Sequence, residues 1–550
     1  MLTRRAFTLG TSSVFAGNLT GCGQIRRFFR PDVPRAAIDI HVHVFNGRDV
    51  PVVGFLRQVI LRDPHTPPDR DVLSEAFLLL LKSILLAGTP TAANELAGLD
   101  VRDAPAPEDQ LLARDERNVA DGITSFSGQA ATSFSTTLRS EANRIFDRLA
   151  AEVGQPDLRT QLQSPQASGR MIAAEVFRRG VPGALVSGDT GEYLHQSAFI
   201  QTIRWAGMLT RPRYDILGAL DRLYGGEDQI RIFSPSLVDF GAWFLTDEPV
   251  TPLDEQIELL AAIGRKFSGA LILPFVAFCP LRAALEREDL PARDPLRHVK
   301  QAVLNRGFLG VKLYPPMGFR PFGNNIDHLS WAPRSPLGGG AALDHELVDL
   351  YSWCVANDVP IKAHANNSNA AAPGTGVFAD PAGWRAVLDQ PEFHDLRLNL
   401  AHFGGFDETA PATALTSTGD WEESLAEMVG LYPGLYFDLG YWTEAADTDA
   451  PQRPNVLARV RELLASSPKM PERMMYGSDW SMIGREPAHP AYLAGVQQAL
   501  IELDLDEAQI VAVMGGNAAA FLGLDRDGAQ KTRVAAFYKD HPIYQELLSG

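Results

Sequence analysis

The sequence predicts an α/β protein: a (β/α)8 TIM-type barrel with a large helical insertion after its first strand. Eight short apolar runs recur along the chain, and from the second onward their starts lie 37 to 51 residues apart. This spacing leaves room for a strand, a helix and two loops, which favours a parallel sheet. One interval is much longer, because 183 residues without a convincing strand separate Phe45 from Gln229. A doubly wound open sheet is the alternative, and the lack of a glycine-rich phosphate-binding pattern after the first run disfavours it.

The eight runs are rich in the apolar and β-branched residues that are typical of buried parallel strands. In chain order they are residues 36–44, 230–237, 270–278, 308–314, 359–365, 396–402, 435–440 and 474–479. Eight such strands with helices between them can close into a barrel. Barrel enzymes carry their catalytic residues at the carboxyl ends of the strands.

The long interval has the apolar periodicity of helices rather than strands. Helical patterns occur at 72–86, 111–120, 135–153, 171–179, 193–209 and 214–224. A connection of this length is expected to fold by itself. We therefore assign 36–45 and 229–526 to the barrel, 46–228 to a helical insertion and 527–550 to a C-terminal tail. The insertion is interpreted either as a lid or pocket wall or as a structural or oligomer-forming appendage.

The N-terminus resembles a twin-arginine export signal joined to a lipobox. Arg4 and Arg5 precede a modest apolar run, and a Leu-Thr-Gly-Cys sequence ends at Cys22. We expect residues 1–21 to be a signal peptide and 22–35 to be a linker. Lipidation of Cys22 would place the protein in the periplasm or cell envelope, with the lipid anchor as its membrane contact. A cytoplasmic protein with a basic N-terminus is the alternative.

Composition narrows the classes of partner. Lys and Arg number 50 against 67 Asp and Glu, a net charge of −17, so nucleic acid is not expected to bind. Apart from Cys22 the cysteines are Cys279 and Cys354, too few for a disulfide scaffold or a cysteine-rich metal site. No run is long and apolar enough to suggest a membrane span. A small-molecule substrate is the expected partner, and a homo-oligomer is left open.

Five of the predicted strands carry residues suited to a metal site. In the first, Asp39, His41 and His43 alternate and therefore share one strand face. Neutral imidazole is the commonest metal ligand, so the two histidines could bind one ion from one side. The fourth, fifth, sixth and eighth strands contribute Lys312, His364, His402 and Asp479. Because strand ends converge at one rim of a barrel, we expect these groups to meet there.

These motifs are similar to those of the amidohydrolase superfamily, in particular its amidohydrolase-related, aminocarboxymuconate-semialdehyde decarboxylase-like branch. The similarity covers 36–45 and about 229–526. The motifs are Asp-Ile-His-Val-His (39–43), Gly-Val-Lys (310–312), Ala-His (363–364), Ala-His-Phe-Gly-Gly (401–405), Gly-Ser-Asp-Trp (477–480) and Gly-Asn-Ala (516–518). The insertion lies outside this resemblance.

The resemblance implies a role for each residue of the set. His41, His43, His364 and Asp479 would bind a divalent metal, with zinc the favoured ion. His402 would bind a second ion or polarise a substrate carbonyl. Lys312 begins a Lys-Leu-Tyr-Pro motif similar to that of cyclic-amide hydrolases, in which a carboxylated lysine bridges two metals. An unmodified Lys312 would instead be a cation near the substrate, and a one-metal site is the favoured interpretation.

The expected reaction is hydrolysis of an amide, lactone or ester-like bond. A divalent ion acidifies water, Asp479 would accept its proton and return it to the leaving group, and His402 would stabilise the oxyanion. Non-oxidative decarboxylation on the same scaffold is one alternative, and an exported binding protein with a structural metal site is another. Asp39 is expected to orient a ligand histidine or a neighbouring basic group. Candidate substrate contacts are Tyr314, Arg320, Asn366 and Trp480.

Overall fold

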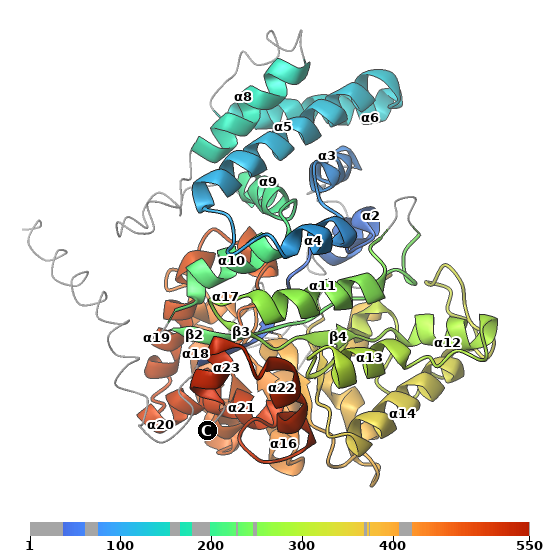
Figure 1. Ribbon diagram of the computed structural model, residues 1–550, viewed down its shortest axis with the longest axis vertical. Helices are drawn as coiled ribbons and strands as arrows, with labels where there is room; N and C mark the ends of the chain where they lie inside the picture. The colour runs from blue at the N-terminus through green and yellow to red at the C-terminus, as the bar shows by residue number, and fades with distance from the viewer. Residues whose placement is uncertain are drawn as a thin grey trace, which may run out of the picture.

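The computed structural model describes residues 37–60, 75–153, 165–178, 198–226, 229–245, 250–367, 371–372, 374–405 and 421–548. The expected signal peptide, the linker and Cys22 lie outside these residues. Figure 1 shows a lower body built around the strands and an upper layer of helices from the first half of the chain.

All eight predicted runs contain parallel strand. The strands are β1 (Ala37–Val42), β2 (Ile230–Pro235), β3 (Leu271–Ile272), β4 (Phe275–Ala277), β5 (Gly310–Leu313), β6 (Ile361–Ala363), β7 (Leu398–Leu400), β8 (Leu435–Asp438) and β9 (Met474–Met475). The third predicted strand is divided into β3 and β4 at Pro274, which has no N–H to donate to a neighbouring strand.

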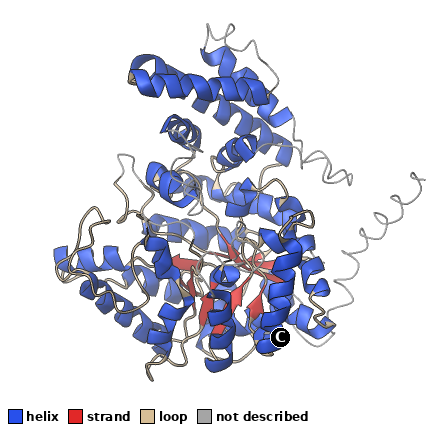
Figure 2. Cartoon of the chain, turned by 180° about the vertical axis from the view of Figure 1, so that it is seen from behind, coloured by secondary structure: helices blue, strands red, loops and turns tan. Residues whose placement is uncertain are grey.

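The strands close into a barrel, as predicted. They form two sheets, β1-β2-β3 and β4-β5-β6-β7-β8-β9. A bridge between Ser236 and Phe275 joins the sheets on one side. On the other side, the Ile40 N–H donates to the Tyr476 carbonyl at 3.1 Å, and Val42 pairs with Trp480. The first and last strands are therefore neighbours, and helices surround the strands in Figure 2.

Most of the outer layer follows the strand–helix order. The helices are α11 (Leu253–Lys266), α12 (Pro280–Asp289), α13 (Arg297–Asn305), α14 (Gly340–Ala356), α15 (Arg385–Leu388), α16 (Trp421–Leu431), α17 (Thr443–Ala446), α18 (Arg453–Ser466), α19 (Tyr492–Glu502), α20 (Glu507–Val511) and α21 (Asn517–Leu522). In α11, acidic residues occupy the first turn and basic residues the last, which suits the helix dipole. Short 3-10 or π turns occur at η2 (Phe55–Ile60), η5 (Pro315–Met317), η6 (Thr375–Ala379), η7 (Pro381–Trp384), η8 (Ala401–Gly404), η9 (Met470–Glu472), η10 (Met482–Arg485), η11 (His489–Ala491) and η12 (Ala512–Gly516).

The amino-terminal end of the barrel is covered by the segment expected to be a tail. It forms helices α22 (Ala529–Tyr538) and α23 (Pro542–Leu547). The Tyr538 hydroxyl lies 2.7 Å from the carbonyl of Ile272 and 3.1 Å from that of Gly307, and Arg231 pairs with Glu546 at 2.6 Å. Residues 529–547 are thus part of the packed barrel rather than an extended appendage.

The insertion is helical, as predicted. Its elements are α2 (Val52–Gly54), α3 (Glu75–Leu86), α4 (Ala92–Leu99), α5 (Glu108–Thr132), α6 (Thr136–Glu152), α8 (Pro165–Arg178), α9 (Ala198–Met208) and α10 (Arg213–Tyr224). Helix α5 is longer than its pattern suggests, because contacts with α3 and α8 stabilise a second half that contains Gly122 and Gly128. Helix α4 was not predicted and begins at Thr91, whose side chain accepts a hydrogen bond from the Asn94 N–H.

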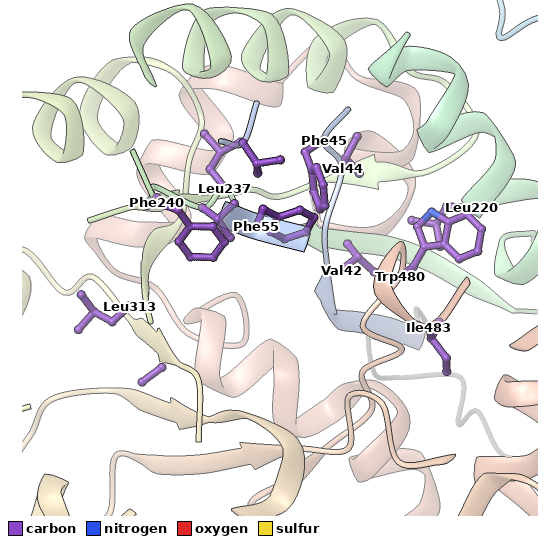
Figure 3. Packing of buried hydrophobic residues seen from close by; sticks show 14 of the residues in the cluster. Val42, Val44, Phe45, Phe55, Leu220, Leu237, Phe240, Leu313, Trp480 and Ile483 are labelled. Carbon is purple, nitrogen blue, oxygen red and sulfur yellow. The ribbon is translucent and has the colours of Figure 1, made fainter. Parts of the chain in front are cut away.

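A continuous apolar core joins the insertion to the barrel mouth. Val42 and Val44 of the first strand region, Trp480 and Ile483 after β9, and Leu220 of α10 all belong to this cluster, part of which Figure 3 shows. Among the described residues, no helix combines the length and the apolar character needed to cross a lipid bilayer.

Candidate metal centre

Three predicted ligands meet at the carboxyl ends of β1 and β9. One ligand atom from each of His41, His43 and Asp479 lies within 4.8 Å of the others, and all three residues are buried. The Nε2 atom of each histidine is 3.5 Å from Asp479 Oδ1. The Asp479 N–H donates to the His41 carbonyl at 2.7 Å, so barrel closure itself brings the two segments together.

The two histidines are held in the tautomer that a metal requires. His41 Nδ1 lies 3.0 Å from Asp438 Oδ1, and His43 Nδ1 lies 2.9 Å from the Ser236 carbonyl oxygen. A carboxylate and a carbonyl only accept hydrogen bonds, so each Nδ1 carries the proton and each Nε2 lone pair faces the centre. Burial lowers the pKa of His41 to about 3, although Asp438 opposes the shift, and burial lowers the pKa of His43 well below its usual range. Both rings are therefore neutral, as metal ligands must be.

Asp438 at the end of β8 performs the orienting role that was expected of Asp39. Its Oδ1 contacts His41 Nδ1 and accepts from the Gly440 N–H at 2.9 Å, while Oδ2 accepts from Asn399 Nδ2 at 2.6 Å. Burial disfavours its charge, but His41 and these hydrogen bonds lower the pKa of Asp438 below its usual range. Nothing local in the sequence shows that the Asp438 carboxylate reaches β1, so this role was not predicted.

Asp39 contacts backbone instead of a histidine ring. Its Oδ1 accepts from the His41 N–H at 3.2 Å and from the Ser478 N–H at 3.0 Å. Burial raises the pKa of Asp39 to about 7, and the hydrogen bonds from Ser478 and His41 only partly oppose this. Asp39 thus ties β1 to the segment after β9 without touching an imidazole.

His402 and His364 form a second pair of rings beside the three ligands. His402 Nδ1 donates to the Gly440 carbonyl at 2.9 Å, so its Nε2 accepts from His364 Nδ1 at 3.0 Å. The His402 ring centre lies 4.8 Å from that of His41. Burial lowers the pKa of His402 to about 4 and that of His364 well below its usual range. His364 is outside the group of three ligand atoms within 4.8 Å, and its expected role as a direct ligand stays a prediction.

Two buried lysines lie in the barrel beside these groups. Lys312 Nζ is 3.2 Å from His41 Nε2, and burial lowers the pKa of Lys312 to about 8 while Asp438 and Asp479 oppose the change. Lys362 was not predicted to belong to the site. It donates to the Ile40 carbonyl at 2.6 Å and to the Ser234 carbonyl at 2.9 Å. Its signal in the sequence is its position two residues before His364, on the same face of β6.

Several residues of the centre have a backbone conformation that costs energy. Asp479, His402, Phe403 and Tyr441 have φ values of 58°, 66°, 50° and 59°. Residues other than glycine rarely occupy this left-handed region, and such strain clusters at functional sites. Burial raises the pKa of Asp479 well above its usual range, with Lys312 opposing the shift.

The four candidate substrate contacts differ in position. The Tyr314 ring centre is 4.4 Å from that of His364. Asn366 lies against Gly405, at the start of the connection that follows β6. Arg320 is exposed and stacks on Phe378 at 4.7 Å. Arg320 therefore lies at the surface beside Phe378, and its contact with substrate stays a prediction.

The Trp480 side chain packs against the insertion. It is buried with its ring centre 6.5 Å from that of Tyr224 and 5.8 Å from that of His489. The left-handed backbone at Asp479 (φ 58°) interrupts the strand here, so the direction of the Trp480 side chain does not follow from the alternation of an extended segment.

A small cavity of about 10 Å³ lies beside the centre, close to the volume of one water-sized probe. Lys312 and Tyr314 line it together with apolar side chains that include Trp243, Phe278 and Phe319. A substrate group entering here would therefore meet the cationic Lys312, the acidic Asp239 and several aromatic side chains.

Comparison with known families agrees with this geometry. Residues 285–524 match a family model described as Amidohydrolase. This part of the chain is similar to amidohydrolase domains. The matched residues contain Lys312, His364, His402 and Asp479, whereas His41 and His43 lie on β1, outside the match.

Similar solved structures were also found. An amidohydrolase from Burkholderia multivorans with bound zinc shares 15% identity over 58% of this chain and 91% of that chain, with a TM-score of 0.35. A Lactobacillus casei protein provisionally named a metal-dependent hydrolase shares 14% identity over 59% of this chain and 76% of that chain (TM-score 0.34). An uncharacterized TIM-barrel protein from Bordetella bronchiseptica shares 14% identity over 49% and 83% (TM-score 0.27). Among curated proteins, no match to the sequence was found.

Proposed function

We propose that the protein is a metal-dependent hydrolase that cleaves an amide, lactone or ester-like bond of a small molecule. One divalent ion, with zinc favoured, would be held by His41, His43 and Asp479. The observation that carries this proposal is the buried group of three ligand atoms within 4.8 Å, with the Nδ1 of each histidine satisfied elsewhere. Catalytic zinc sites use three protein ligands and keep one position open, whereas structural sites use four.

The residues around the ligands suit hydrolysis. A bound divalent ion would supply Lewis-acid polarisation of a carbonyl and would acidify water. Asp479, whose pKa burial raises, is suited to accept a proton from the attacking water and return it to the leaving group. His402 stands beside His41, where its Nε2 accepts from His364 Nδ1, so it is suited to orient the His364 ring rather than to donate to a substrate carbonyl. Lys312 adds a hydrogen-bond donor on the cavity side, where it would contact an electronegative substrate group.

Decarboxylation on the same scaffold is a second candidate that Lys312 favours, because an ammonium group beside the metal ligands would bind a substrate carboxylate. Carboxylation of Lys312 would instead give a two-metal site. We further propose export and lipid anchoring at Cys22, on the strength of the N-terminal sequence.

Metal analysis joined to a substrate screen tests the proposal. We expect about one ion per chain in purified protein and loss of that ion in the His41→Asn variant. Turnover is expected with lactones, cyclic amides or esters, without release of carbon dioxide, and it should vanish after chelation and return with zinc. Full turnover by metal-free protein would refute the hydrolase proposal. Carbon dioxide release from aromatic or unsaturated acids would replace it with the decarboxylase, and two ions per chain would assign Lys312 a bridging role.

A further inference from the structure

The insertion contacts the loop that follows the metal-ligand aspartate. We call residues 480–485 the β9 loop. Gln201 and Trp205 lie one helical turn apart on α9, so they share a face of that helix. Gln201 Nε2 donates to the Gly484 carbonyl at 2.7 Å, and Trp205 Nε1 donates to the Ser481 carbonyl at 2.8 Å. Both side chains are buried, with exposed fractions of 6% and 1%.

The β9 loop is in turn fastened to Asp479. The N–H groups of Met482 and Ile483 donate to the Asp479 carbonyl at 2.8 and 3.2 Å. This tight turn cannot shift at Ser481 or Gly484 without moving the backbone of Asp479. Since Asp479 has a φ of 58°, its conformation persists only where its surroundings enforce it.

Close packing around the two hydrogen bonds leaves little room for α9 and the β9 loop to move apart or slide. A Cβ atom added at Gly484 would lie 3.3 Å from Trp205 Cδ1, which shows how closely the helix approaches the loop. The Tyr224 hydroxyl on α10 donates a hydrogen bond to the His489 carbonyl, which lies in the segment after the β9 loop. Trp480 and Ile483 of the loop belong to the same apolar cluster as Leu220 of α10 (Figure 3).

We propose that Gln201 and Trp205 are positioning residues, through which the insertion holds Asp479 in the geometry that binds metal. The insertion is then a fixed part of the centre rather than a lid, because opening would break both hydrogen bonds and expose Trp205. The metal-binding part of this inference rests on the proposed function. The positioning part rests on the contacts between α9 and the β9 loop alone.

The test uses Trp205→Phe, Gln201→Leu and the double variant in the full chain. Each removes a donor and keeps most of the apolar volume. The matched control is Asn118→Leu, which deletes a buried hydrogen bond to Thr210 Oγ1 (2.8 Å) elsewhere in the insertion. Thermal unfolding identifies variants that have lost the fold, and Trp205→Phe alone suffices if the double variant does not fold.

Two measurements follow. Hydrogen exchange of the Met482 and Ile483 amides in metal-free protein should become at least tenfold faster in the double variant and should stay unchanged in the control. Affinity for Co²⁺, measured by competition with a chromophoric chelator, should fall about 10- to 100-fold, the effect expected when residues that orient ligands are lost. The visible spectrum of bound Co²⁺ should also change.

The outcomes separate the two proposals. Wild-type exchange and wild-type affinity in the double variant would overturn the positioning role, as would equal losses in the double variant and the control. If wild-type protein binds no Co²⁺, the proposed function fails, and the exchange measurement alone decides whether α9 positions the loop.

Discussion

Replacing Asp438 with Asn should weaken metal binding although Asp438 is not itself a predicted ligand. The substitution keeps the shape of the side chain and removes its charge. An asparagine oxygen can still accept from His41 Nδ1 and from the Gly440 N–H. Its new amide would face Asn399 Nδ2, but Asn399 can turn over, because within the described residues its Oδ1 has no hydrogen-bond partner. The variant should therefore fold.

The size of the effect follows from the lost charge. A carboxylate on His41 Nδ1 fixes the tautomer and makes Nε2 more basic, and losing such a partner typically costs 10- to 100-fold in metal affinity. That range corresponds to about 1.4–2.7 kcal/mol. The remaining neutral hydrogen bond still holds the ring, so the effect should lie toward the lower end.

Asp39→Asn is the matched control for this prediction. Both aspartates are fully buried, but Asp39 accepts from backbone N–H groups that an asparagine oxygen can also satisfy. We expect its Zn²⁺ affinity to stay within about twofold of wild type, measured by chelator competition at pH 7.5. Equal losses in the two variants would show that buried charge in general, and not the Asp438–His41 contact, controls the centre.

Three further predictions concern stability. Zn²⁺ at 100 times its dissociation constant should raise the free energy of unfolding in urea by about 2.7 kcal/mol, and a chelator should reverse this change. An unchanged free energy of unfolding with Zn²⁺ would contradict a metal site in the folded protein. Lys362→Met removes the hydrogen-bond donor of the Ile40 and Ser234 carbonyls. The free energy of unfolding should therefore fall by about 1–3 kcal/mol for each carbonyl left unsatisfied. Unchanged urea unfolding would show that these hydrogen bonds do not stabilise the fold. Burial raises the pKa of Glu95 from 4.5 to about 7 against the opposing charge of Arg213, so its contribution to stability is complete below pH 4.5 and is lost as the pH rises through about 7. Thermal unfolding of Glu95→Gln should lack that loss, and an identical pH profile would refute the assignment.

The strand-borne part of the centre could be predicted because two simple rules govern it. Alternation puts His41 and His43 on one face, and barrel closure brings Asp479 to them. The orienting groups follow no such rule. The acceptor for His43 is the carbonyl of Ser236, a backbone atom without any side-chain signal. The sequence shows that Asp438 ends an apolar run. Only the closed barrel shows that the partner of its carboxylate is His41.

Other differences arise where tertiary contacts override local pattern. The α22–α23 segment is polar enough to suggest a tail. At the amino-terminal end of the barrel, however, Tyr538 hydrogen-bonds the Ile272 carbonyl and Glu546 pairs with Arg231. Trp480 was expected to be a substrate contact at the rim of the barrel. The backbone at Asp479 is left-handed rather than extended, and the indole lies in the apolar core beneath the insertion.

The place of the insertion in the chain explains what it touches. In an open sheet the first and last strands lie at distant positions, and a segment inserted after the first would have no fixed relation to the loop after the last. In the closed barrel β1 and β9 are neighbours, joined by the contact between Ile40 and Tyr476. A helical layer that grows from the end of β1 therefore covers both the histidine pair and the β9 loop. Its α9 helix reaches Ser481 across 276 positions of sequence for this reason. The same closure that gathers the ligands also places the insertion where it can hold one of them.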